Sequence, residues 1–345
     1  MQRTTLKQGT LDWEKARELR IGSSEVFDIV KYYASDEELQ YCGFNAEAFR
    51  AEKPYTTVWA LYHKLLKDGF YKKEVLAPEF AEYGHAVEPY GVYKLQQGRQ
   101  KKLKPGVVYA DERLIASLDV EGVAEEIDLI PFDYGSGTPK VGQRFVCEQK
   151  SMLPQMVKNG LPFKYIVQAQ YQIMQTKADF YILQLMVLKI DDTPFNRGKI
   201  CQMSRKKKYD FLNENLSVSH YYFMDNIHLA KLIEKCLNLF FDDVDNHREP
   251  RPFIEYDSTK NIIESIRLNA LYNDKLIFDF DLTAYKKAKE DEELASERRI
   301  ALLQNIVDIA KQNNVCRFRS ENGTTAMFAK DGSFRMRTPA EVINQ

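Results

Sequence analysis

Three short segments between residues 115 and 172 decide the fold: Ile115-Ala116-Ser117-Leu118-Asp119, Val146-Cys147-Glu148-Gln149-Lys150 and Tyr165-Ile166-Val167-Gln168-Ala169-Gln170. The first two contain apolar runs with strand character, which lead to the acidic residues Asp119 and Glu148. Because side chains alternate along a strand with a period of two, Glu148 and Lys150 share one face. If the two strands are neighbours, Asp119 and Glu148 converge at the edge of a sheet.

Two convergent carboxylates suit a hard divalent cation. Asp119, Glu148 and the backbone carbonyl of Gln149 form an oxygen site of the kind that Mg²⁺ or Mn²⁺ prefers. Lys150 beside that site can orient an attacking water or stabilise the charge of a reacting phosphate. The same short motif also arises when Glu148 and Lys150 form a solvated strand face and Asp119 is a turn residue. The surrounding sequence therefore has to distinguish a metal site from this alternative.

The composition restricts the class of protein. The 345 residues are 44% apolar and 29% charged, with a net charge of −1, as in ordinary globular proteins. Nucleic-acid binding therefore has to come from local patches such as Arg99–Lys104 and Arg205–Lys208. The five scattered cysteines include no CxxC pair, which indicates a reducing compartment and no zinc or iron–sulfur site. The polar start and the absence of a membrane-length apolar run predict a cytoplasmic protein.

The flanking segments supply further candidate site residues. Residues 76–97 form a strong helix pattern that carries Glu88 at the edge of its buried stripe, where a carboxylate needs a partner or a metal unless it is simply solvated. Residues 161–176 form a second helix, on which Gln168 and Gln172 are four apart and share a face. Ser24, at the start of a helix near Arg17, predicts a phosphate pocket, although a capping serine and surface arginines would look the same.

Two further stretches complete the first 250 residues. Residues 179–190 are almost continuously apolar, as expected of a strand covered on both faces. Residues 199–206 are a candidate for another strand.

The last hundred residues have a different character. A long charged helix is predicted for residues 281–312, followed by three short strands with turns at Asn322-Gly323 and Asp331-Gly332. In these strands apolar residues alternate with four arginines: Arg317, Arg319, Arg335 and Arg337. We expect a meander whose apolar face packs on the helix and whose arginine face is exposed, either as an ordinary solvated surface or as a DNA-tracking surface.

The order of these features resembles the YqaJ-type viral recombinases, which include the lambda-exonuclease-like alkaline exonucleases of phages. The resemblance covers roughly residues 10–250 and rests on Trp13 to Val26 with Arg17 and Ser24, Gly84-x-x-x-Glu88, Asp119, Glu148-x-Lys150 and Tyr165-x-x-Gln168-x-Gln170. Two positions depart from the family pattern. Leu118-Asp119-Val120 replaces the usual Pro-Asp-Gly, and the polar Gln149 replaces an apolar residue. Neither change removes a functional group.

The resemblance implies a fold and a set of residue roles. The fold is α/β, a restriction-endonuclease-like PD-(D/E)xK core with a mixed central sheet flanked by helices at residues 1–250, and a small C-terminal helix and β-meander appendage at 251–345. Asp119, Glu148 and the Gln149 carbonyl would bind the catalytic metal, with Glu88 assisting directly or through water. Lys150 would be the catalytic lysine, and Gln168 would support the metal site or its nucleophile. Arg17 and Ser24 would hold a 5′-terminal phosphate.

The implied activity is that of a Mg²⁺- or Mn²⁺-dependent exonuclease acting 5′→3′ on double-stranded DNA. Such an enzyme leaves 3′ single-stranded tails for recombination or repair. Members of the family work as ring-shaped trimers around DNA, and their usual partner is a phage single-strand annealing protein. A structure-selective or nicking endonuclease on the same core and a non-catalytic DNA-binding protein that kept the fold are the alternatives, with an iron–sulfur nuclease a more distant one.

Overall fold

The computed structural model describes residues 1–70, 78–152, 160–189, 194–257, 259–269, 276–277, 282, 285, 295–320, 324–329 and 334–337. The chain divides into two compact units. The first unit comprises Met1–Tyr55 and Lys73–Asp242, and the second comprises Thr56–Lys72 and Asp243–Gln345. This division places a short segment from the first quarter of the chain with the C-terminal residues, whereas the sequence suggested a single boundary at residue 250. Across the residues that the model describes, helices with the length and apolar character of a membrane span are absent.

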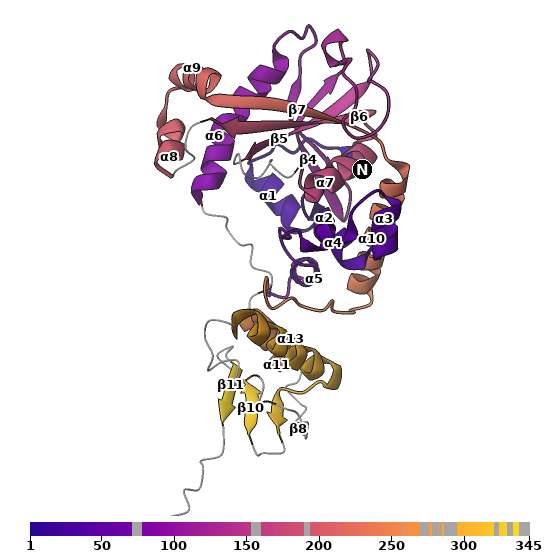
Figure 1. Ribbon diagram of the computed structural model, residues 1–345, viewed down its shortest axis with the longest axis vertical. Helices are drawn as coiled ribbons and strands as arrows, with labels where there is room; N and C mark the ends of the chain where they lie inside the picture. Colours follow the sequence, from indigo (N-terminus) through magenta and orange to yellow (C-terminus); the bar gives the residue numbers. More distant parts are fainter. Residues whose placement is uncertain are drawn as a thin grey trace, which may run out of the picture. The chain divides into compact units, whose positions relative to one another are not determined.

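The first unit is built on a mixed sheet of seven strands, as expected (Figure 1). The strand order is β1-β3-β4-β5-β6-β7, and β2 pairs with β4 outside this path. Only the pairs β2–β4 and β5–β6 are parallel; the other neighbours are antiparallel. The strands are β1 (Gln2–Arg3), β2 (Ile21–Gly22), β3 (Lys104–Ala110), β4 (Leu114–Val123), β5 (Arg144–Met152), β6 (Phe180–Leu188) and β7 (Leu216–Met224).

The continuous apolar run at 179–190 becomes β6, whose residues are almost all buried, so that prediction is confirmed. The strand predicted for residues 199–206 is wrong. That stretch forms the end of α8 and the start of α9, because Ile200 packs on Tyr83, Val87 and Leu212 in a helical core cluster.

Helices cover both faces of this sheet (Figure 1). Helix α6 contacts β5, and α7 contacts β4 and β6. On the α6 side, Phe145 and Cys147 of β5 belong to a core cluster with Leu95. The helices are α1 (Leu11–Glu18), α2 (Val26–Tyr33), α3 (Asp36–Tyr41), α4 (Ala46–Ala51), α6 (Pro78–Gln96), α7 (Phe163–Thr176), α8 (Pro194–Gln202), α9 (Arg205–Asn215) and α10 (Ile227–Asp245).

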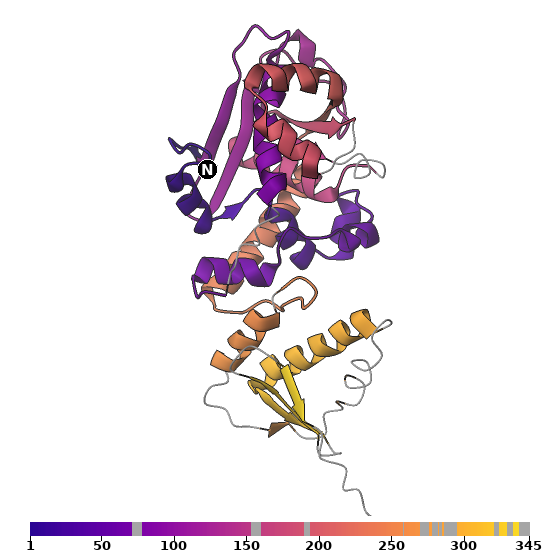
Figure 2. The same cartoon turned by 90° about the vertical axis from the view of Figure 1, so that its left-hand side faces the viewer.

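The second unit is a small helix-and-sheet unit with its own core (Figure 2). It contains α5 (Val58–Leu66), α11 (Thr259–Asn269), α13 (Ala295–Asn313), β8 (Leu276–Ile277), β9 (Arg317–Arg319), β10 (Thr325–Phe328) and β11 (Phe334–Arg337). The sheet order is β11-β10-β9-β8, with β9, β10 and β11 forming the expected antiparallel meander. The turns predicted at Asn322-Gly323 and Asp331-Gly332 lie outside the described residues. Phe318 and Phe328 pack with Val307 of α13, so the apolar face of the meander packs on the helix as predicted.

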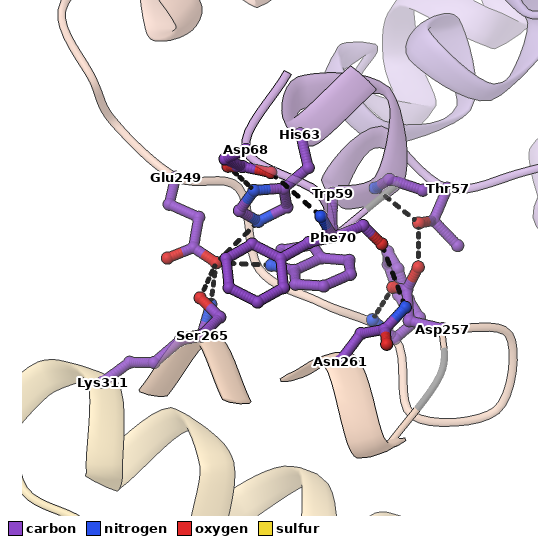
Figure 3. Close-up of polar contacts among 12 residues, drawn as sticks. Thr57, Trp59, His63, Asp68, Phe70, Glu249, Asp257, Asn261, Ser265 and Lys311 are labelled. Carbon is purple, nitrogen blue, oxygen red and sulfur yellow. Dashed lines mark hydrogen bonds and ion pairs between the residues drawn. The ribbon is translucent and has the colours of Figure 1, made fainter. Parts of the chain in front are cut away.

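A half-buried carboxylate explains why residues 56–72 belong to this unit (Figure 3). Glu249 Oε1 accepts hydrogen bonds from Trp59 Nε1, Lys311 Nζ and Ser265 Oγ, and lies 3.2 Å from His63 Nε2. Burial opposes ionisation of Glu249, but the contacts with His63 and Lys311 lower the pKa of its carboxyl to about 2. The ionised carboxylate of Glu249 thus joins helix α5 to residues that lie far along the chain.

Candidate active site

The pairing of β4 with β5 brings the two predicted acids together. These strands are antiparallel, and the last paired residues in this direction are Val120 and Cys147. Asp119 and Glu148 lie one step beyond that pair, at the point where the two strands separate. Asp119 Oδ2 accepts the backbone N–H of Gln149 at 2.6 Å. The carboxylates therefore converge as the sequence predicted.

Lys150 contacts Glu148 directly on the same strand face. Lys150 Nζ lies 2.6 Å from Glu148 Oε1, and the two side chains are only 23% and 10% exposed. The ammonium nitrogen also lies 5.7 Å from the centre of the Tyr165 ring, on helix α7. A cation over an aromatic face is attracted by the ring quadrupole, so Tyr165 helps to hold the lysine in place. The sequence motif did not assign this role to the tyrosine.

The electrostatics of this group are those of a crowded anionic site. Burial and the neighbouring charges of Glu148 and Glu88 hold the pKa of Asp119 well above its usual range. Burial by itself would lower the pKa of Lys150, but the charges of Glu148 and Asp119 outweigh it and raise that pKa. The lysine is thus charged, whereas the two acids together favour an added cation.

Helix α7 supplies an amide to the carboxylate, and it comes from Gln172. Gln172 Nε2 donates to Glu148 Oε2 at 3.1 Å and lies 3.4 Å from the carbonyl oxygen of Ser117. Gln168, one turn earlier, is buried, and its Oε1 has no hydrogen-bond partner. The shared face of the two glutamines was the only sequence signal for Gln172.

The unusual polar residue of the motif, Gln149, points to the opposite side of the sheet. Its side-chain amide lies 2.8 Å from that of Gln184 on β6 and 2.9 Å from both the carbonyl oxygen of Glu88 and the backbone nitrogen of Val92. A Cβ atom at Gly91 would lie 2.8 Å from three Gln149 side-chain atoms, so only glycine allows this approach. Gln149 therefore fastens the backbone of α6, beside Glu88, to the strand that carries Glu148 and Lys150.

Glu88 itself lies near the site without completing a cluster of three acids. Its carboxylate is 3.6 Å from His85 Nδ1, one turn back on α6. Within the described ranges, three or more His, Cys, Asp or Glu side chains do not converge at one point that could hold a metal ion. The donors that the structure brings together are thus the carboxylates of Asp119 and Glu148.

Arg17, one of the two predicted phosphate residues, is linked to the same strand through Trp13. The guanidinium carbon of Arg17 is 4.8 Å from the centre of the Trp13 ring, and Trp13 Nε1 donates to Ser117 Oγ at 2.8 Å. Ser117 precedes Asp119 by two residues on β4, so the two share a strand face. Helix α1 is thereby tied to the strand of the site, a link that the sequence did not suggest.

The alternative reading of Ser24 as a helix cap does not hold, because Ser24 is not the N-cap residue of the helix that follows it. Helix α2 begins at Val26, and its N-cap residue Glu25 makes no side-chain cap hydrogen bond. Glu25 Oε2 instead accepts the backbone N–H of Gly22 at 2.7 Å, so a buried glutamate closes this turn. Ser24 lies in that turn and is half-buried.

The four predicted arginines of the second unit occupy equivalent positions on two strands. Arg317 and Arg335 are each in register with Met327, and Arg319 and Arg337 are each in register with Thr325. Arg317, Arg319 and Arg335 are exposed.

Comparison with known proteins gives matches among solved structures only. No protein-family model and no curated protein matches the sequence. An alkaline exonuclease from Laribacter hongkongensis, LHK-Exo, is 15% identical with a TM-score of 0.41 over 69% of this chain and 94% of that chain. LHK-Exo in complex with dAMP gives 15% and 0.40 over the same shares. A phage-related exonuclease from Haemophilus somnus 129PT is 11% identical with a TM-score of 0.40, over 66% of this chain and 95% of that chain. Each of these likenesses is to a solved exonuclease structure at an identity of 15% or less.

Proposed function

We propose that this protein is a Mg²⁺- or Mn²⁺-dependent deoxyribonuclease that degrades double-stranded DNA from its ends in the 5′→3′ direction and leaves 3′ single-stranded tails. The observation that carries the proposal is the placement of Asp119 beside Glu148 and Lys150 where β4 and β5 diverge. There Asp119 accepts the backbone N–H of Gln149, and Lys150 Nζ lies 2.6 Å from Glu148 Oε1. Two acids and a lysine at one point are the groups that metal-assisted phosphodiester hydrolysis needs.

The donor set fits a hard divalent cation. The neighbouring charge of Glu148 disfavours ionisation of Asp119, and a cation with oxygen preference relieves that repulsion; thiol or imidazole donors are absent from the residues that meet here. Asp119 and Glu148 would hold the metal, with the carbonyl of Gln149 as a further donor. Glu88 would assist directly or through water. When bound, the metal supplies charge neutralisation of the phosphate and a lowered pKa of water.

The protein's own groups have separate tasks in this proposal. Gln172 fixes Glu148 through Oε2, and the backbone N–H of Gln149 fixes Asp119 through Oδ2. Lys150, held between Glu148 and the Tyr165 ring, presents an ammonium that donates to the attacking water or to a non-bridging phosphate oxygen. Gln168, buried beside them on α7, would support the nucleophile.

The direction of degradation rests on the 5′-phosphate residues. Arg17 and Ser24 would bind the terminal phosphate, since a guanidinium fork suits a phosphate better than a hydroxyl. By the family resemblance, the enzyme would act as a ring-shaped trimer in the cytoplasm together with a phage single-strand annealing protein.

Digestion of an end-labelled linear duplex beside a covalently closed circle tests the function. The proposal predicts loss of the linear DNA only, in Mg²⁺ or Mn²⁺ and not in chelator, with nucleotides released from 5′ ends. Attack on both DNAs would indicate an endonuclease, and attack on neither would indicate a non-catalytic DNA-binding protein.

A further inference from the structure

The meander of the second unit carries a compact group of cations on one side, here named the arginine face. It consists of the positions Arg317, Arg319, Thr325, Met327, Arg335 and Arg337. The register places an arginine on either side of Met327 in one row, and an arginine on either side of Thr325 in the next. Rows two residues apart along a strand are about 7 Å apart, and the outer strands are about 10 Å apart. The four arginine positions thus outline a small rectangle.

The opposite side of the same strands is core. Phe318, Ala326 and Phe328 are buried at 0%, 3% and 1% exposure, and they pack with Val307 and Ile306 of α13. Because side chains alternate along each strand, the arginine positions have to lie on the other side. The structure agrees, since Arg317, Arg319, Thr325, Met327 and Arg335 are all exposed.

The arginine face carries a local excess of positive charge. Four of its six positions are cationic and none is acidic. The net charge of the whole chain is −1, so the cluster is a local feature and not the result of a basic composition.

We propose that the arginine face binds the phosphate backbone of duplex DNA, a proposal that rests on the nuclease function proposed above and adds a second contact to it. Duplex DNA carries one negative charge for about every 1.7 Å of its axis, so a patch about 10 Å wide meets several phosphates. Arginine forks bind phosphate oxygens in pairs. A lipid surface fits less well, because a membrane-binding face carries several large apolar or aromatic residues. Among the six positions of the arginine face only Met327 is of that kind, with Leu276 of β8 in register beside Arg317.

The test is the salt dependence of DNA binding by the full-length protein in chelator, where cleavage does not occur. The probe is a fluorescent blunt duplex, and the variant is Arg317→Gln with Arg319→Gln. Lys260→Gln with Arg299→Gln is the matched control, because these residues are exposed cations of the same unit outside the arginine face. We expect the slope of log affinity against log salt to fall by about 2 in the face variant and to stay at the wild-type value in the control.

Three further measurements separate the outcomes. The melting temperature of the face variant should stay close to that of the wild type, so that a changed slope reports DNA binding and not unfolding. An unchanged slope, the same change in both variants, or stronger binding to phosphatidylserine vesicles than to the duplex would overturn the proposal. Incubation of the wild type with Mg²⁺ and linear duplex tests the nuclease function separately. A protein that binds DNA through the arginine face but does not cleave it would fail this cleavage assay and still show the expected change in binding.

Discussion

The side-chain amide of Gln172 donates to Glu148 Oε2 at 3.1 Å, while Lys150 occupies Glu148 Oε1 at 2.6 Å. Each oxygen of the carboxylate thus has its own partner, one from α7 and one from the same strand. Gln172 is completely buried. It is therefore a positioning residue that sets the orientation of the carboxylate.

Gln172→Ala should weaken metal binding by about 10–100-fold, the usual effect of losing a residue that orients a metal ligand. The measurement is the Mg²⁺ concentration at half-maximal cleavage rate, with the rate at saturating Mg²⁺ recovering in part. Gln170→Ala is the matched control, because Gln170 is a buried amide on the same helix that bonds Asp225 and the backbone of Asn226 instead of Glu148. If Gln170→Ala raises the Mg²⁺ requirement as much as Gln172→Ala does, the effect does not depend on the orientation of Glu148.

The close approach of Gly91 to Gln149 predicts a reciprocal pair of substitutions. Gly91→Ala would place a Cβ 2.8 Å from the Gln149 amide, which is held by Gln184. We expect a loss of about 1–3 kcal/mol in the free energy of unfolding, since overpacking outweighs the gain in helix propensity of about 1 kcal/mol. In a Gln149→Ala background, Gly91→Ala should be neutral or stabilising, as urea unfolding of the double-mutant cycle would show. Additive effects would mean that the two residues are independent.

Arg17→Ala and Ser24→Ala should slow degradation of 5′-phosphorylated duplexes more than that of 5′-hydroxyl duplexes. The reason is that a fixed cation favours a terminal phosphate over a neutral hydroxyl. Arg20→Ala serves as the control, because the Arg20 guanidinium is already bound to the carbonyls of Asp111 and Ala16. Equal losses on both kinds of end would show that Arg17 and Ser24 only support the fold.

The second unit should become less stable as the pH rises from about 4 to about 6. Burial raises the pKa of Asp257 to about 6 from 3.8, against the hydrogen bonds from Thr57 and the backbone of Phe253. Between about pH 4 and about pH 6 the Asp257 carboxyl is therefore protonated in the folded state and ionised in the unfolded state. The stability that this bound proton contributes is lost as the pH rises through about 6. The pKa of Glu249 is lowered to about 2, so its ionisation stabilises the folded state. That stabilisation is lost only as the pH falls below about 4.5.

Fluorescence of Trp59 can follow this transition in the full chain. The sequence has only two tryptophans, so a Trp13→Phe background leaves Trp59, which lies in the second unit, as the reporter. Asp257→Asn should remove most of the pH dependence between pH 4 and 6. The same dependence in both proteins would contradict the assignment to Asp257.

The sequence predicted those parts of the site that depend on local periodicity. The period of two put Glu148 and Lys150 on one face, and the pairing of apolar strands put Asp119 beside them. The sequence could not predict which of Gln168 and Gln172 contacts Glu148, because both lie on the same helix face. The packing of α7 on β4 determines that Gln172 does. Gln149 looked like a departure from the motif because its partners, Gly91 and Gln184, lie on other elements. The same limit applies to α5, because Trp59 contacts Glu249, which lies 190 positions later in the sequence.

The central claim is that Glu148, with Asp119 and Lys150, carries out the cleavage of DNA. The most direct measurement is the single-turnover rate of Glu148→Gln on a 5′-phosphorylated linear duplex in Mg²⁺, beside the wild type and Glu121→Gln. Glu121 is a matched control because it is also a buried glutamate, on β4, where it accepts the Tyr109 hydroxyl at 3.0 Å. The account predicts a loss on the order of 10²-fold or more for Glu148→Gln, with its melting temperature retained and Glu121→Gln cleaving near the wild-type rate. Cleavage by Glu148→Gln at the wild-type rate would contradict it.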